Sequence, residues 1–403
     1  MAADVVLVNP PHGDERRVEH FALGYLAAPL RRAGIRTEIV DAGLLEASIR
    51  QAVDVMAAAA PRVVGITVKQ RQGRAMVAIA QGVRCRLPQT HITAGGHFPT
   101  FCHERLLKDV PALDSVVRGE GDLVFVDLVQ RLLGGDQWHG LPGLSFRQDG
   151  CVAATAPGPL IPNLDELPFP ARDTAGVAMR RNGFLSMYSS RGCYGKCTFC
   201  SGRAFHATQA GPAWRGRSVD NVVEEMVRLA HDYGCKSLGF TDDNFIGPGA
   251  IGRKRAHAFA DALIRRRPRF EFAIACRADD VEPDLFRHLR EAGLCMVELG
   301  IESGNQRQLD RLRKGLTGQD NKRALSILNE LCIPFRDYLI MFDPDSTLGE
   351  CLDTLRFVAS EGALRDTHGF ENAADPLDGT ELCERLRQQG RLRGSYLERY
   401  SYS

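Results

Sequence analysis

In the stretch Phe184-Leu-Ser-Met-Tyr-Ser-Ser-Arg-Gly-Cys193-Tyr-Gly-Lys-Cys197-Thr-Phe-Cys200, a strand-like segment leads into three cysteines within eight residues. Three thiolates in one loop can hold three irons of a cubane cluster, whereas a closed 4Fe–4S site normally takes four protein thiolates. The remaining iron would be free to bind a substrate. Gly195 would let the loop wrap closely around such a cluster, and Lys196 would help to balance the thiolate charge.

Zinc and unrelated buried thiols are the alternative uses of these cysteines. A zinc site needs a fourth ligand, for which His206 is close enough in sequence, but structural zinc usually closes small domains. The spacing therefore favours the cluster, and we expect His206 to be a surface or packing residue. The other nine cysteines are predicted to be ordinary thiols in a reducing compartment. They are Cys85, Cys102, Cys151, Cys235, Cys276, Cys295, Cys332, Cys351 and Cys383.

Alternating strand-like and helical patterns continue beyond the cysteines. Six strands with helices between them in about 200 residues predict a partial (β/α)6 barrel, because a full eightfold barrel usually needs about 250. The C-terminal face of a barrel is its active end, so the cysteine loop would lie where chemistry is expected. The expected strands are 184–188, 237–241, 270–275, 296–301 and 335–342, with a weak last unit at 369–389, and the helices are 219–232, 253–266, 283–291, 319–331 and 348–361.

The first third of the chain also alternates, with five buried-type strands separated by helices. This pattern predicts a parallel sheet with helices on both faces, a flavodoxin-like or Rossmann-like unit. Ligands of such sheets bind beyond the carboxyl ends of the strands, which here are residues 9–12, 68–72, 95–99 and 118–121. The expected strands are 5–8, 37–40, 63–68, 91–94 and 115–117, and the helices are 24–33, 47–60, 75–87, 104–109 and 123–133.

The domain organisation follows from where these patterns stop. Five prolines between Pro157 and Pro170 indicate a linker. We therefore expect a first domain at 1–137, a proline-rich linker at 138–180, the barrel at 181–375 and a C-terminal extension at 376–403.

Charge and composition exclude several classes of protein. The 51 basic and 50 acidic residues give a net charge of +1, which argues against a polybasic nucleic-acid binder. A hydrophobic content of 44% with 25% charged residues is typical of a globular protein. The sequence has no secretory leader and no apolar window long enough to span a bilayer, so we expect a cytoplasmic protein without membrane partners.

The motif Cys193-x-x-x-Cys197-x-x-Cys200 after a first barrel strand resembles the radical S-adenosylmethionine (SAM) superfamily. Other stretches resemble its branch with an N-terminal cobalamin (B12)-binding-type domain, and the likeness covers roughly residues 4 to 390. These stretches are Asn9-Pro10-Pro11, Leu23–Ala27, Gly95-Gly96-His97, Arg118–Gly121, Leu164–Pro170, Phe240–Phe245 and Gly300–Gly304.

The resemblance implies a role for each matching residue. Cys193, Cys197 and Cys200 would ligate three irons of a 4Fe–4S cluster, and SAM would chelate the fourth. Electron transfer would cleave SAM to methionine and a 5′-deoxyadenosyl radical, which abstracts hydrogen from the substrate. An external donor of the flavodoxin or ferredoxin type would supply the electron.

The resemblance also implies cofactor-binding residues at the ends of barrel strands. Phe199 would flank adenine, Asp242 and Asp243 would meet the methionine amino group, Arg277 would pair with the SAM carboxylate, and Glu302 would meet ribose or substrate. Asp243 and Glu302 are also the candidate catalytic residues. The residues alone allow helix capping for the two aspartates and surface ion pairs for Arg277 and Glu302.

Whether the first domain holds cobalamin decides the expected reaction. Residues 69–74 carry five long polar side chains where the lower corrin face would need a flat floor, and an Asp-x-His-x-x-Gly motif is absent. Gly95-Gly96 would allow a ligand to approach the backbone, or would simply form a tight turn. We expect a domain that is structural or shapes the substrate site, and hence a cobalamin-independent radical dehydration of a sugar-like diol, as in aminoglycoside deoxygenation. The alternative is a cobalamin-dependent C-methyltransferase that consumes two SAM molecules.

Two further functions are less well supported by the residues. RNA methylthiotransferases share the barrel, but they need a second cluster and a basic C-terminal module, and here Cys85, Cys102 and Cys151 lie far apart. A non-catalytic cobalamin sensor would not need the three cysteines. We therefore expect a small, hydroxyl-rich substrate, which polar strand-end residues would suit. These are Asp243, Asn244, Glu302, Arg336 and Asp337.

Overall fold

The computed structural model describes residues 3–11, 18–266, 270–361 and 367–403. The chain divides into two units, which are treated separately below. Unit 1 consists of Met1–Gly183, Ala204–Gly211 and Gly394–Tyr400, and unit 2 consists of Phe184–Arg203, Pro212–Arg393 and Ser401–Ser403.

Unit 1 contains a seven-stranded sheet in the order β2-β1-β3-β4-β5-β6-β7. The first five strands are parallel, and the order 2-1-3-4-5 is flavodoxin-like, with its reversal between β1 and β3. The predicted fold class of this part is therefore confirmed. The five parallel strands are β1 (Val5–Asn9), β2 (Thr37–Asp41), β3 (Val63–Thr67), β4 (His91–Gly95) and β5 (Ser115–Val117).

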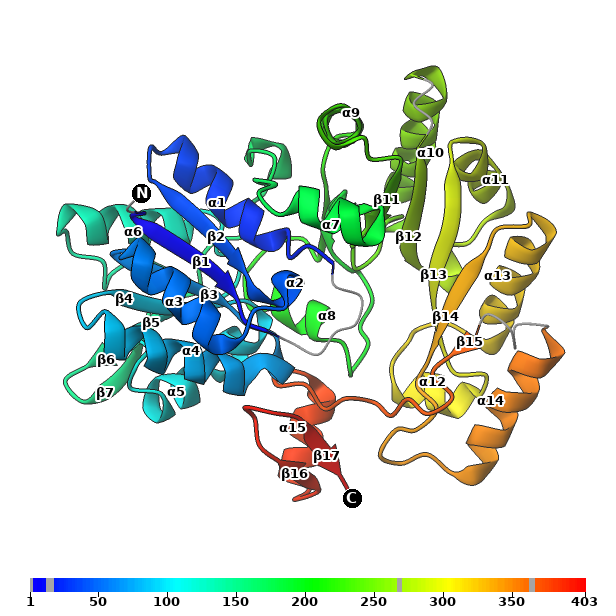
Figure 1. Cartoon of the computed structure of the whole chain (residues 1–403). Helices are drawn as coiled ribbons and strands as arrows, with labels where there is room; N and C mark the ends of the chain where they lie inside the picture. The colour runs from blue at the N-terminus through cyan, green and yellow to red at the C-terminus, as the bar shows by residue number, and fades with distance from the viewer. Residues whose placement is uncertain (1–2, 12–17, 267–269, 362–366) are drawn as a thin grey trace. The chain divides into compact units, whose positions relative to one another are not determined.

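Helices cover both faces of this sheet (Figure 1). Alternate side chains of β1 enter different cores: Val6 and Val8 pack on one face, while Val5 and Leu7 pack on the other. Burial on both faces explains why these strands read as unbroken apolar runs. The helices are α1 (Ala22–Arg32), α2 (Ala42–Leu45), α3 (Ile49–Ala59), α4 (Gly73–Arg86), α5 (His97–Asp109), α6 (Val124–Gly134) and α7 (Ala175–Asn182).

Part of the segment predicted as a linker is strand instead. Within residues 138–180, β6 (Leu144–Gln148) and β7 (Cys151–Ala154) form an antiparallel hairpin that extends the sheet from β5. The turn is Asp149-Gly150, with φ of 51° and 78°. Asp-Gly with two positive φ angles is the preferred two-residue hairpin turn, so the sequence held a signal that the proline content obscured. The domain boundaries themselves stay a prediction.

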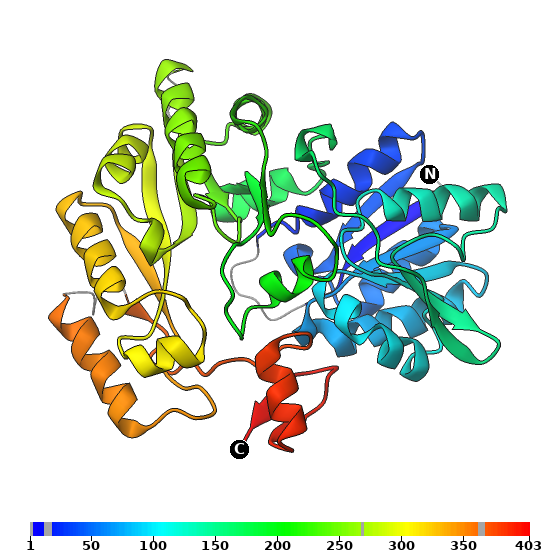
Figure 2. The same cartoon turned by 180° about the vertical axis from the view of Figure 1, so that it is seen from behind.

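Unit 2 contains a six-stranded parallel sheet in the order β15-β14-β13-β12-β11-β8. This is the predicted partial (β/α)6 barrel, and Figure 2 shows the same strands from behind. The strands are β8 (Leu185–Met187), β11 (Ser237–Phe240), β12 (Glu271–Arg277), β13 (Leu294–Glu302), β14 (Phe335–Leu339) and β15 (Thr367–His368).

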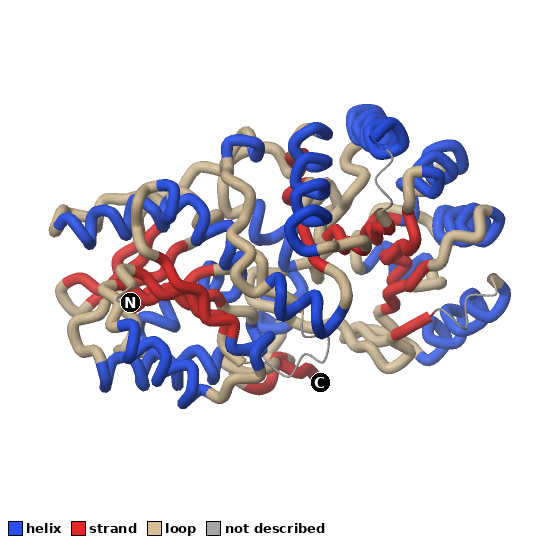
Figure 3. The backbone as a smooth tube through the Cα atoms, turned by 45° about the horizontal axis from the view of Figure 1, so that its top comes forward, coloured by secondary structure: helices blue, strands red, loops and turns tan. Residues whose placement is uncertain are grey.

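Helices line the outer side of the curved sheet in unit 2 (Figure 3). Phe240, Phe245, Phe259 and Phe272 pack at tilted or edge-to-face angles between the sheet and one of these helices. Capping boxes at Thr317 and Thr347 start two of the helices. The helices are α9 (Val219–Tyr233), α10 (Gly249–Arg266), α11 (Pro283–Glu291), α13 (Gly318–Glu330) and α14 (Leu348–Ser360).

Shorter elements complete the chain. They are β9 (Ser190–Gly192), α8 (Ser201–His206), β10 (Trp214–Gly216), α12 (Gln306–Arg311), α15 (Glu381–Gln388), β16 (Leu392–Gly394), β17 (Tyr400–Tyr402) and three 3-10 turns at Gln70–Gln72, Leu164–Glu166 and Ala278–Asp280. In the described part of the chain, every helix falls short of the length or apolar content that a membrane crossing requires.

Candidate iron–sulfur and cofactor site

The three cysteines of the motif lie in the loop between β9 and α8, and all three are half-buried. Burial raises the pKa of each thiol, that of Cys200 to about 11. Cys197 raises the pKa of Cys193 further, and both raise that of Cys200, so the three sulfurs lie close together. The backbone N–H of Gly195 donates to Cys193 at 3.3 Å, and that of Arg203 donates to Cys200 at 3.5 Å. Deprotonating all three therefore requires compensating positive charge.

Arg277, the last residue of β12, provides one such charge. Its guanidinium is held by Asp279 through two hydrogen bonds of 2.8 and 3.0 Å. A Cβ placed on Gly195 would lie only 3.0 Å from Arg277 Nη1 and 3.4 Å from Cys193 Sγ. The missing side chain at Gly195 thus lets the cysteine loop and the guanidinium lie side by side, and Arg277 lowers the pKa of Cys197 and Cys193 against the effect of burial.

Lys314 provides a second charge, which sequence reasoning missed. Its ammonium lies 2.8 Å from the carboxylate of Glu302, and the two residues are only 6% and 7% exposed. After burial, Lys314 has the largest effect on the pKa of Cys197, which it lowers. Lys314 is twelve residues from its partner, beyond a short helix, so no local pattern could have indicated the pairing.

The two strand-end aspartates have different surroundings. Asp242 is buried, and burial raises its pKa although it accepts hydrogen bonds from Ser189 N at 3.0 Å, Ser189 Oγ at 2.7 Å and Ser190 Oγ. Asp243 is exposed and raises the pKa of Cys193 and Cys200. Asp242 therefore fixes the turn that leads into the cysteine loop, while Asp243 is the carboxylate beside the sulfurs.

Phe199 is half-buried and packs against an apolar cluster that contains Leu312, Ile340 and Leu382. Tyr194, a further residue that sequence reasoning missed, donates to Asp280 at 2.6 Å, and Asn244 donates to the other oxygen of that carboxylate at 2.8 Å. The structure thus brings together the three cysteines, Asp243, Arg277 and Glu302. The cofactor roles of these residues, and of Phe199 and Asp242, stay predictions.

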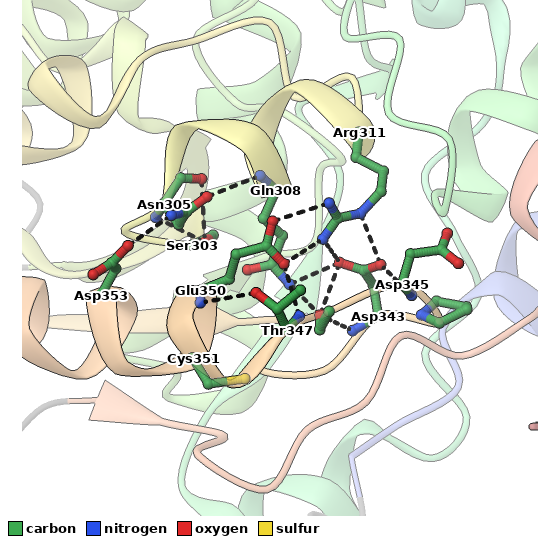
Figure 4. Close-up of polar contacts among 12 residues, drawn as sticks. Ser303, Asn305, Gln308, Arg311, Asp343, Asp345, Thr347, Glu350, Cys351 and Asp353 are labelled. Atoms are coloured by element: carbon green, nitrogen blue, oxygen red, sulfur yellow. Dashed lines mark hydrogen bonds and ion pairs between the residues drawn. The ribbon is translucent and has the colours of Figure 1, made fainter.

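An arginine-centred network holds the segment that leads to Lys314 (Figure 4). Arg311, the last residue of α12, donates to both oxygens of Asp343 at 2.9 and 2.7 Å and to both oxygens of Glu350 at 3.1 Å. Gln308 donates to Asp343 at 2.9 Å. The network ties α12 to the loop after β14 and to the first turn of α14.

A single-ion zinc site has no support among the residues that the structure describes, where no three Cys, His, Asp or Glu side chains converge on one ion. A cubane cluster places several irons and sulfides between its thiolates, so three sulfurs in one half-buried loop with two nearby cations fit that group instead. His206 belongs to unit 1, where it is buried 3.9 Å from Glu120 and beside Phe205.

The ligand edge of the sheet in unit 1 differs from our expectation. Gln72 turns inward, donating to Asn9 at 3.0 Å and to the Pro10 carbonyl at 2.9 Å, while its own oxygen accepts from Lys69 N at 2.9 Å. Arg74 pairs with Glu398. Gln72 and Arg74 are therefore engaged by other residues of unit 1. The crowding of the corrin site that we inferred from residues 69–74 is not found for these two side chains. Gly96, with φ of 102°, keeps the turn after β4 free of a side chain.

One chain that contains both a curved parallel half-barrel, with three thiols in the loop after its first strand, and a flavodoxin-like sheet has the composition of a radical SAM protein with a B12-binding-type domain. The family models agree: that of the radical SAM superfamily matches residues 187–358, and that of the B12 binding domain matches residues 15–129. The chain belongs to the radical SAM superfamily and carries a B12-binding domain. Membership implies a 4Fe–4S cluster and SAM as cofactors.

Relatives and a solved structure extend this result. The chain is 30% identical over 365 residues to an uncharacterized methyltransferase of Pyrococcus horikoshii, covering 90% of this chain and 77% of that protein. It is 27% identical to the cytidylyl-2-hydroxyethylphosphonate methyltransferase of Streptomyces wedmorensis, covering 96% of this chain and 82% of that protein. It is 26% identical to the anaerobic magnesium-protoporphyrin IX monomethyl ester cyclase of a Synechocystis strain, covering 81% of this chain and 66% of that protein. The cobalamin-dependent SAM radical enzyme OxsB shares the fold, with a TM-score of 0.87 at 22% identity, over 100% of this chain and 64% of that one.

These findings correct our expectation of the reaction. A cobalamin-independent dehydration of a diol is wrong as the main prediction, because the first domain matches the B12-binding family and the relatives include methyltransferases. The physical argument failed at residues 69–74, where the inward turn of Gln72 could not be read from the sequence.

Proposed function

We propose that this protein is a cobalamin-dependent radical SAM methyltransferase that acts on a small molecule. The observation that carries the proposal is the presence, in one chain, of a B12-binding domain and of a half-buried three-cysteine loop flanked by cations. Relatives named as methyltransferases support the reaction class.

The chain's own residues would bind and orient the cofactors. Cys193, Cys197 and Cys200 would hold the cluster, and the Gly195 and Arg203 N–H groups would donate to two of the thiolates. The cluster would supply the electron that cleaves SAM, and cobalamin would carry the methyl group. Arg277 would pair with the carboxylate of SAM.

The edge of unit 1 fits a flat cofactor better than the sequence suggested. The Gln72 side chain is occupied by its hydrogen bonds to Asn9 and the Pro10 carbonyl. Gly96 has no side chain that would keep a ligand away from its backbone. His97 stacks on Phe205 at 4.1 Å between ring centroids, so its ring is already packed within the unit.

The test is anaerobic purification of the whole chain from cells supplied with cobalamin, followed by absorbance and mass spectrometry of the bound cofactors. We expect about one corrinoid and one 4Fe–4S cluster per chain. With SAM and a reductant, S-adenosylhomocysteine and 5′-deoxyadenosine should both form. A chain that assembles the cluster and cleaves SAM but retains no corrinoid, and forms no S-adenosylhomocysteine, would overturn the proposal.

A further inference from the structure

The backbone that carries Lys314 is fastened directly to the cysteine loop. The Thr198 N–H, between two of the cysteines, donates to the Leu312 carbonyl at 3.0 Å. The chain then turns through Arg313, with φ of 48°, and the Lys314 N–H donates back to Leu309 at 3.0 Å. The position of Lys314 is therefore fixed relative to Cys197, and not merely near it.

Two further contacts hold this arrangement. On the other side of the loop, the Thr198 carbonyl accepts from the Leu382 N–H at 3.0 Å, next to the first residue of α15. On the Lys314 side, the Arg311 network fixes the end of α12 (Figure 4). The cysteine loop is thus hydrogen-bonded to two segments, one at Leu312 and one at Leu382. The segment at Leu312, which leads to Lys314, is also held by the side-chain contacts of Arg311.

The end of β13 is shaped to admit the ion pair. A Cβ on Gly300 would lie 2.6 Å from Lys314 Nζ and 3.0 Å from Glu302 Oε1, so only glycine leaves room for the two charged groups. Glu302 itself has φ of 64°, in the left-handed region that non-glycine residues rarely adopt. Such a conformation is strained and persists only where surrounding contacts enforce it.

Stability does not explain this pair, because a buried ion pair gains little over apolar residues of similar volume. Because an unpaired buried charge is costly, the 2.8 Å contact with the Glu302 carboxylate keeps the Lys314 side chain as an ammonium. Gly315, the next residue, approaches the Arg277 guanidinium, since a Cβ there would lie 3.9 Å from Nη2. Lys314 and Arg277 therefore place two fixed positive charges beside the loop.

We propose that Lys314 is a positioning residue of the cluster site: held by Glu302, its ammonium offsets the charge of the Cys197 thiolate and raises the reduction potential of the cluster. This inference rests on the proposed assignment of the three cysteines as cluster ligands. A fixed cation beside a low-dielectric centre stabilises the form that has gained an electron. Removal of the ammonium should make the cluster harder to reduce, and removal of the Glu302 charge should make it easier.

The experiment is a potentiometric titration of the reconstituted whole chain, followed by electron paramagnetic resonance of the reduced cluster. In Lys314→Met, we expect the ratio of reduced to oxidised cluster at a fixed potential to fall about tenfold, which is about 59 mV for a one-electron couple. In Glu302→Gln, the ratio should rise. The double variant Glu302→Gln with Lys314→Met removes both charges, so it leaves no unpaired buried ion, and its ratio should also fall below that of the wild type.

Lys322→Met is the matched control, since Lys322 pairs with Glu361 at 3.0 Å and its side chain is 55% exposed. It should leave the titration unchanged. If Lys314→Met and the double variant both assemble a cluster with the wild-type potential, the inference is wrong. If Lys314→Met does not fold, the double variant and the opposite sign of Glu302→Gln still decide. A wild-type chain that assembles no cluster would instead refute the assignment of the cysteines.

Discussion

Replacing Arg311 with Met should destabilise unit 2. Met keeps the apolar stem of the side chain and removes the guanidinium that joins Asp343 and Glu350. The Asp343 side chain is 1% exposed and that of Arg311 is 22% exposed, so the change leaves a buried carboxylate without its cation.

The expected magnitude follows from the four hydrogen bonds that Arg311 donates. Removing one partner of a buried ion pair costs about 3–5 kcal/mol. Because Arg311 keeps some contact with water, and Gln308 still donates to Asp343, we expect a loss of about 2–4 kcal/mol in the free energy of unfolding. With a urea dependence of roughly 1–3 kcal/mol per molar, the unfolding midpoint should fall by about 1–2 M.

The pH dependence gives a second signature. Burial alone would raise the pKa of Asp343, but the hydrogen bonds from Arg311, the Asp345 N–H and Gln308, together with the Arg311 charge, outweigh it. Arg311 also lowers the pKa of Glu350. A carboxyl whose folded pKa is depressed contributes stability above its unfolded pKa and loses it as the pH falls through the folded value. The wild type should therefore lose stability in acid, and Arg311→Met should lose less, because most of that contribution is already gone.

The assay uses the fact that the chain has two tryptophans, Trp138 in unit 1 and Trp214 in unit 2. In a Trp138→Phe background, fluorescence of Trp214 reports the unfolding of unit 2 in urea, which does not screen ion pairs as a guanidinium salt would. Arg311→Lys is the control that keeps the positive charge but loses the paired hydrogen bonds of the guanidinium. Its unfolding midpoint should lie between those of the wild type and Arg311→Met. A midpoint for Arg311→Met within about 0.2 M of the wild type would refute the reasoning.

Three other changes test separate parts of the structure. Replacing the three loop cysteines with Ala should abolish iron binding and SAM cleavage, whereas Cys332→Ala, at an exposed thiol, should retain both; retention of cleavage in the triple variant would contradict the assignment. Burial lowers the pKa of His91 to about 4, so protonation opposes folding, and unit 1 should lose up to about 3 kcal/mol as the pH falls from 6.5 to 4. His91→Gln should remove most of this pH dependence of stability, followed by the fluorescence of Trp138, which packs on His91 at 5.1 Å between ring centroids. If the variant has the same pH dependence as the wild type, the prediction is wrong. Gly300→Ala should displace the Lys314 ammonium and lower the free energy of unfolding in urea by about 1–3 kcal/mol, because the new Cβ would lie 2.6 Å from Nζ. Wild-type stability in this variant would contradict the prediction.

The elements that sequence reasoning located are those whose signal is local. Strands such as Val63–Thr67 are buried on both faces, so they read as apolar runs, and the order of helices between them restricts the fold to parallel sheets. The cysteine loop was found because its chemistry lies within eight residues. The hairpin at residues 144–154 was missed because the surrounding prolines outweighed a two-residue turn.

The rest of the site depends on contacts between distant parts of the chain. The pairing of Glu302 with Lys314 requires the Gly300 backbone, a short helix and a turn to come together, and no residue type signals that in advance. Asp242 and Asp243 are identical in type and adjacent, yet one faces Ser189 and Ser190 while the other faces solvent beside the sulfurs. Side-chain direction at a strand end is set by the fold and not by composition.

The return of residues 394–400 to unit 1 has a consequence for how the chain folds during synthesis. Leu397 covers Gly73, where a Cβ would lie 2.5 Å from the Leu397 carbonyl, and Tyr396 donates to Asp109 at 2.7 Å. Residues 1–183 of unit 1 are synthesised before the barrel of unit 2, whereas the segment that covers α4 and α5 is synthesised after it. While the barrel is translated, unit 1 therefore lacks this segment, and the apolar surface that Tyr396 and Leu397 cover stays exposed over that interval.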